Sequence, residues 1–92
     1  MIGFVRCECI IYDAHSLKEK RSVLKSVITR IKQQYNVSVA ELDHHDVWQR
    51  TEIGIVSLST NRTGAEKELQ RAIGMIESRP EIELANTVYE WL

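Results

Sequence analysis

Features that mark several common classes of protein are missing from this chain of 92 residues. No apolar run approaches the ~20 residues that a membrane-spanning helix requires, and no charged N-terminal segment precedes an apolar one, as in a secretory signal. There are two cysteines, Cys7 and Cys9. They are poorly placed to bridge each other on one strand, and no third cysteine completes a metal site. We therefore expect a cytoplasmic protein whose cysteines are small buried hydrophobic residues.

Motifs of catalysis are missing too. The chain has no Gly-rich phosphate-binding loop and no readable Ser–His–Asp or Cys–His arrangement, so we expect neither enzyme activity nor a cofactor. Linkers, internal repeats and low-complexity segments are also absent. A chain of this length allows one domain, residues 1–92, with a compact core.

The most informative stretch is residues 16–41. Apolar residues recur there at intervals of three and four, which predicts an amphipathic helix. Ser16 and Glu19 have the spacing of a capping box, so we expect the helix to begin at Leu17. Asn36 suits a left-handed helix stop, and the alternating residues that follow predict a strand. The apolar positions of the helix are Leu17, Leu24, Val27, Ile28, Ile31 and Tyr35.

Charge in this helix is segregated from the rest of the chain. Residues 18–32 hold six basic side chains and one acidic side chain, a net charge of +5, whereas the remaining residues sum to −6. Spacing by seven places Lys18, Lys25 and Lys32 on one ridge with Arg21. Ideal helical geometry instead points Lys20 into the apolar stripe, where a charge needs a partner or an escape to water. The candidate nucleic-acid-binding residues are Lys18, Lys20, Arg21, Lys25 and Lys32.

The remaining elements complete a familiar order. Strand patterns occupy residues 2–12, 47–59 and 81–92. The capping-box spacing of Thr63 and Glu66 predicts a second helix. The order βαββαβ predicts an α+β, ferredoxin-like domain with two helices on one face of a four-stranded antiparallel sheet. The buried stripe of the second helix is Ala65, Leu69, Ala72, Ile73 and Ile76.

Such a fold leaves one sheet face bare. Here that face is more apolar than a solvated surface needs, so we expect it to contact a partner, such as a second copy of the chain. Residues 52–58 contain no aromatic side chain, so base stacking on the sheet is not expected. In the same strand pattern, Gly54 suits a close approach or a bulge, and Trp48 is expected to be a packing anchor rather than a stacking platform. The apolar residues of the bare face are Ile2, Phe4, Ile10 and Tyr12.

Two histidine segments leave alternatives open. His15, beside the start of the first helix, either helps Lys18 and Arg21 to gather an anion or is a solvated loop residue. His44 and His45, flanked by aspartates, have side chains that ligate zinc or nickel, but adjacent residues on an extended chain diverge. A turn is the simpler interpretation of the histidine pair.

Several of these segments carry a resemblance. SLKEKRSVLKSVI and NVSVAE, with the tryptophan at position 48 and the IGIV segment, resemble the YlxP-like family of short bacterial proteins, a domain of unknown function. The resemblance covers essentially the whole chain and implies a ferredoxin-like fold. Genes of the family often lie beside those of translation initiation and ribosome maturation factors, which implies a role near the ribosome. The pair His44 and His45 departs from the family pattern.

Three functional hypotheses follow. The first is a non-enzymatic protein that contacts RNA or a ribosomal subunit through the basic helix, in translation or ribosome maturation. The second is a homodimeric protein-interaction module that uses the open sheet face and has no nucleic-acid role. The third is a small metal-binding protein that uses His44 and His45.

Overall fold

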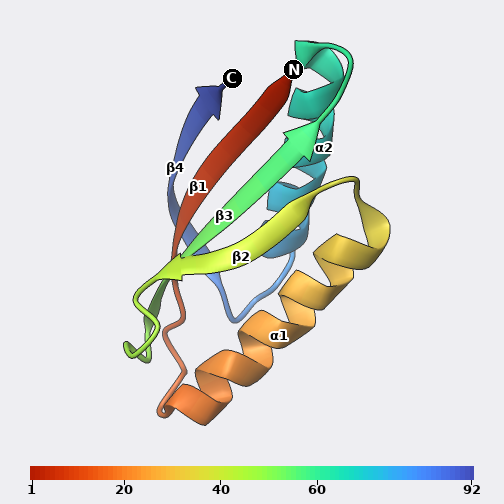
Figure 1. Cartoon of the computed structure of the whole chain (residues 1–92). Coiled ribbons are helices and arrows are strands. Elements are labelled where there is room, and N and C mark those ends of the chain that lie inside the picture. The colour runs from red at the N-terminus through yellow and green to blue at the C-terminus, as the bar shows by residue number, and fades with distance from the viewer.

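A computed structural model describes all of the chain, residues 1–92. The four strands form one antiparallel sheet in the order β2-β3-β1-β4, and both helices lie against the same face of it (Figure 1). The predicted βαββαβ ferredoxin-like fold is therefore confirmed. The elements are β1 (Ile2–Ile10), α1 (Leu17–Gln34), β2 (Ser38–Asp43), β3 (Arg50–Leu58), α2 (Arg62–Glu77) and β4 (Glu83–Trp91).

The core lies between the sheet and the two helices. Alternation along β1 turns Val5, Cys7 and Cys9 toward the helices, and each is at most 2% exposed. Both thiols are free, and burial raises the pKa of each to about 12, so they stay protonated at neutral pH. The whole predicted stripe of α2 is buried, as are Leu24, Val27 and Ile31 of α1.

α1 begins where its cap predicts. The Ser16 hydroxyl accepts a hydrogen bond from the Glu19 N–H at 3.1 Å, so the first helical residue is Leu17. The Glu19 carboxylate in turn accepts from the backbone N–H of His15 at 2.8 Å. This bond is made one residue before the N-cap, where the usual capping box would use the N–H of the N-cap itself.

α2 begins earlier than predicted. Its N-cap is Asn61, whose side-chain oxygen accepts from the Gly64 N–H at 2.8 Å. The predicted capping box of Thr63 and Glu66 is wrong, because an asparagine two residues upstream caps a helix as well as a hydroxyl does. The helix therefore includes Arg62.

The passage from α1 to β2 also differs from expectation. Tyr35 is the C-cap, with extended dihedral angles of φ −127° and ψ 154°, and the chain then extends directly into β2. The left-handed stop predicted at Asn36 is wrong, because the positive-φ residue of this chain is His44, at φ 64°. That residue lies in the loop after β2, where the chain reverses toward β3.

The sheet face opposite the helices is apolar around Gly54. A Cβ atom at Gly54 would lie 2.5 Å from Cδ1 of Leu42, which confirms the predicted close approach. Exposed apolar side chains continue along β1 and β3 on this face, at Ile2, Val56 and Leu58. No helix of the chain is both long enough and apolar enough to cross a membrane.

Candidate nucleic-acid interface

The basic ridge is defined by Lys18, Arg21, Lys25 and Lys32, which all lie on exposed positions of α1. The three salt bridges of the chain involve other cations, so none of these four has an anionic partner. At a rise of 1.5 Å per residue, the ridge extends for about 21 Å along the helix. The exposed hydroxyls of Ser22 and Thr29 lie on the same outward side.

Lys20 does not belong to this ridge. Its side chain is fully buried, its ammonium group lies 3.0 Å from the Glu41 carboxylate, and it donates a hydrogen bond to the His44 carbonyl oxygen. Glu41 also accepts from the Thr51 hydroxyl at 2.6 Å. A side chain held in this way does not reach a phosphate in solvent, so the assignment of Lys20 to nucleic-acid binding is wrong. The inward direction predicted for Lys20 is correct, and Glu41 is the partner that the buried charge requires.

A second residue ties the same loop to the start of α1. The side-chain amide of Gln49 donates to the carbonyl oxygens of Tyr12, at 2.9 Å, and Ala14, at 3.3 Å. The backbone carbonyl of Gln49 accepts from the Ile11 N–H at 2.9 Å. Together with Lys20, these bonds hold the β2–β3 loop, residues 44–49, against the N-terminal end of α1 (Figure 1).

Trp48 lies in this loop and is 50% exposed. The predicted packing anchor is wrong, because β3 begins only at Arg50 and Trp48 is not part of the core cluster. A turn closed by the bond from the Val47 N–H to the His44 carbonyl, at 3.0 Å, lies directly before Trp48, between β2 and β3. Its neighbour Val47 is exposed as well.

His15 and His44 are hydrogen-bonded through their backbone N–H groups. His44 takes its positive φ with its N–H bonded to the Asp43 carboxylate at 2.7 Å, an arrangement typical of a turn. No group of three or more His, Cys, Asp or Glu side chains is arranged to hold a metal ion. At the start of α1, the Glu19 carboxylate already accepts the N–H of His15, so a negative charge is present where an anion would bind.

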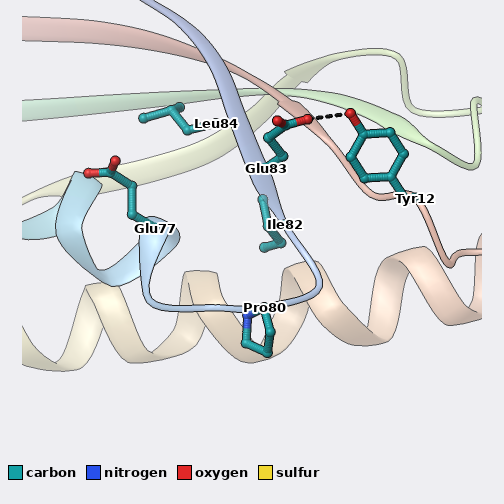
Figure 2. A pocket seen from close by; sticks show the side chains of 6 residues that line it. All are labelled: Tyr12, Glu77, Pro80, Ile82, Glu83 and Leu84. Atoms are coloured by element: carbon teal, nitrogen blue, oxygen red, sulfur yellow. Dashed lines mark hydrogen bonds between the residues drawn. The ribbon is translucent and has the colours of Figure 1, made fainter.

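A shallow pocket of about 400 Å³ lies between the end of α2 and the start of β4 (Figure 2). The Tyr12 hydroxyl donates to the Glu83 carboxylate there, and this bond raises the pKa of Tyr12. Two carboxylates make the pocket acidic, which suits neither phosphate nor RNA. It is lined by Tyr12, Glu77, Pro80, Ile82, Glu83 and Leu84.

The fold and the ridge thus describe a small ferredoxin-like domain with one strongly basic helix face. Residues 2–89 match the model of a family described as "Protein of unknown function (DUF503)". The chain is also 56% identical over 91 residues to the "Uncharacterized protein YlxP" of Bacillus subtilis (strain 168), with 99% of each chain covered. The chain belongs to this family, and the resemblance to YlxP-like proteins is confirmed.

Proposed function

We propose that this protein is a non-enzymatic, cytoplasmic RNA-binding protein that contacts a ribosomal subunit through the basic ridge, in translation or ribosome maturation. The observation that carries the proposal is the set of four exposed cations on one side of α1 that have no anionic partner in the chain. Cations arranged in this way suit the regularly spaced phosphates of a nucleic-acid backbone.

The ridge adds little to the stability of the fold, because exposed charges without close partners contribute little. The contribution of these cations to the free energy of RNA binding is larger, since each phosphate contact releases condensed counterions. Four such contacts give a slope of about −3 in a plot of log K against log salt concentration, at about 0.7–0.9 per contact. Phosphate contacts carry no sequence information, so binding depends on shape and charge more than on base sequence.

Co-sedimentation with small ribosomal subunits across a salt series tests the proposal. We expect binding that weakens steeply with salt and is lost when Lys18, Arg21, Lys25 and Lys32 are all reversed to glutamate. A folded protein that fails to sediment with subunits or to bind RNA even at low salt contradicts the proposal. The salt slope itself is informative, because it counts the phosphate contacts.

A matched pair of double variants separates the ridge from net charge. Lys25→Glu with Lys32→Glu changes the ridge, whereas Lys67→Glu with Arg71→Glu makes the same change of net charge on exposed positions of α2. The ridge predicts loss of binding in the first variant and near wild-type binding in the second. Equal losses in both variants mean that only the overall charge matters.

A second candidate function is homodimerisation through the open sheet face. The specific observation is the exposed apolar surface of that face, where Leu58 is 64% exposed and Leu42 is 43% exposed. Val56→Asp should then yield a monomer that still binds RNA, which sedimentation equilibrium and the RNA assay would test. A wild-type protein that is monomeric at high concentration contradicts this candidate. The metal-binding hypothesis for His44 and His45 has no supporting observation.

A further inference from the structure

We propose that Trp48 is a base-stacking residue, and that the RNA bound by the basic ridge has unpaired nucleotides at the β2–β3 loop. This inference rests on the proposed function and names the class of RNA that the same site takes. It concerns the end of the molecule where the β2–β3 loop meets α1 (Figure 1).

The two tryptophans of the chain differ in what covers them. Trp91 stacks on Tyr89, with ring centroids 6.1 Å apart and planes inclined by 9°, and the Arg62 guanidinium lies 4.5 Å from its ring centroid. Trp48 takes part in neither kind of contact and is half exposed. A large aromatic side chain that the fold leaves without an aromatic or cationic partner is available to a ligand.

The loop that carries Trp48 is held in place before any ligand binds. Lys20 bonds to the His44 carbonyl and Gln49 bonds to the Tyr12 and Ala14 carbonyls, so both ends of the loop are fixed to the segment that begins α1. Little ordering entropy is then lost when a base stacks on Trp48. The buried lysine thus acts as a positioning residue.

The same bonds place the loop that carries Trp48 next to the first turns of α1. Arg21 directly follows Lys20 in α1 and Lys18 precedes it by two residues, and both are exposed. An exposed aromatic side chain beside cations is the combination that binds single strands, where bases stack and phosphates meet basic side chains. Bases inside a duplex are already stacked and cannot use Trp48, so unpaired nucleotides are the expected ligand.

The sheet does not offer a competing platform. β3 contains no aromatic side chain, and the aromatic residue of β1 on the open face, Phe4, lies opposite Val56 and is only partly exposed. The pair of aromatic residues on two central strands, through which RNA-binding domains of this fold class stack bases, is therefore absent here. Trp48 is the exposed tryptophan of the chain and lies in the loop that is bonded to the first turns of α1.

Fluorescence anisotropy with a labelled 12-nucleotide oligouridylate and a 12-base-pair RNA duplex tests the inference. We expect Trp48→Ala to weaken binding of the single strand about tenfold or more and to leave the duplex unchanged, since one stacked base is worth ~1–3 kcal/mol. Trp48→Phe should retain most of the affinity. Circular dichroism and the melting temperature of each variant check that the exposed substitution leaves the fold intact.

Intrinsic fluorescence gives an independent readout. In a Trp91→Phe background, Trp48 is the sole tryptophan, and stacking of a uridine base on it should quench its emission as the single strand is added. A duplex at the same phosphate concentration should quench it far less. Unchanged emission in a protein that binds the single strand overturns the stacking inference.

The outcomes distinguish this inference from the proposed function. If the Lys25→Glu and Lys32→Glu variant and the wild type bind both RNAs equally, the ridge fails and the stacking inference falls with it. If the ridge variant loses both RNAs while Trp48→Ala binds them like wild type, the ridge stands and the stacking inference is wrong. Loss of ribosome co-sedimentation by Trp48→Ala with unchanged oligonucleotide affinity assigns Trp48 to a protein contact and also overturns it.

Discussion

The two helices cover the same sheet face but are built differently. α2 buries an entirely apolar stripe, and its outer face holds paired groups, with Arg71 3.6 Å from Glu68 and Gln70 3.4 Å from Glu66. α1 buries the charged Lys20 and leaves the four cations of the basic ridge without anionic partners.

This difference between the helices distinguishes features that the fold requires from features that it does not require. An apolar stripe and a mixed outer surface are sufficient for a helix to cover a sheet, as α2 demonstrates. α1 departs from this pattern twice. Its buried stripe contains the charged Lys20, and its outer face carries unpaired positive charge. Neither departure improves packing, so both are reasons to look for function on α1. Four predictions sharpen or break this comparison.

The largest expected effect is that of removing the buried charge from α1. Lys20→Ala should lower the free energy of unfolding by about 3 kcal/mol, because it leaves a cavity and removes the partner of a largely buried carboxylate. Glu41, with a side chain 16% exposed, recovers a little solvation, which places the effect at the lower end of the usual range. Urea unfolding measures it.

The matched control replaces the pair by apolar residues. Lys20→Met with Glu41→Leu should be close to wild type in stability, because a buried ion pair is often no better than a packed apolar pair. The Thr51 hydroxyl, which now donates to Glu41, must then find another acceptor. A Lys20→Ala protein as stable as wild type would mean that the loop carrying Trp48 is not fixed by Lys20.

The next effect concerns the apolar layer of β1, beneath α2. Cys7 and Cys9 have folded-state pKa values raised to about 12 by burial, against an ordinary value of 9.0. Above pH 9 the unfolded chain loses these protons while the folded chain keeps them, so stability is full below pH 9 and falls as the pH rises toward 12. By pH 10 the loss is about 1.4 kcal/mol for each thiol.

Urea unfolding at pH 8 and pH 10 checks this decline. A Cys7→Ala and Cys9→Ala variant lacks both thiols and should lose correspondingly less stability over the same interval. A decline of the same size in the variant would assign the pH dependence to other groups. Thiol reagents give a second check, because protonated buried thiols react slowly until the chain unfolds.

The N-caps of the two helices each make one side-chain hydrogen bond to a backbone N–H, so the stability lost with each cap can be compared directly. Ser16→Ala and Asn61→Ala each remove a side-chain acceptor for one backbone N–H, and each should lower the unfolding free energy by about 1 kcal/mol. Glycine at either position should lower the unfolding free energy by only a few tenths of a kcal/mol. The measurement is urea unfolding of the four single variants. A loss confined to one helix would show that the other cap is replaced by water.

Local pattern predicted most of this fold. The order of elements, the first residue of α1 and the inward faces of β1 and α2 follow from periodicity and spacing, which short-range sterics and hydrogen bonds enforce. The predicted start of α2 was wrong because two residues that make good N-caps, Asn61 and Thr63, lie two positions apart. Local sequence alone does not choose between them.

The candidate site was less predictable, because it depends on contacts between distant segments. The direction of Lys20 could be read from the helix period, but its partner Glu41 lies 21 positions further along the chain. Trp48 was expected in the core because it adjoins an apolar strand pattern. The bonds of Gln49 and Lys20, which fix the loop at the surface, have no local signal in the sequence.

The smallest expected effect is also the one that best separates fold from function on α1. Lys25→Ala with Lys32→Ala should change the unfolding free energy by less than about 0.5 kcal/mol, because neither side chain has a partner to lose. Lys67→Ala with Arg71→Ala should lower the unfolding free energy by a few tenths of a kcal/mol, since the exposed ion pair of Arg71 and Glu68 is lost from α2. Urea unfolding should then find both double variants close to wild type, whereas RNA anisotropy should find affinity lost only in the α1 variant. If the α1 variant loses stability in proportion to its loss of affinity, the ridge serves the fold, and the contrast between the two helices disappears.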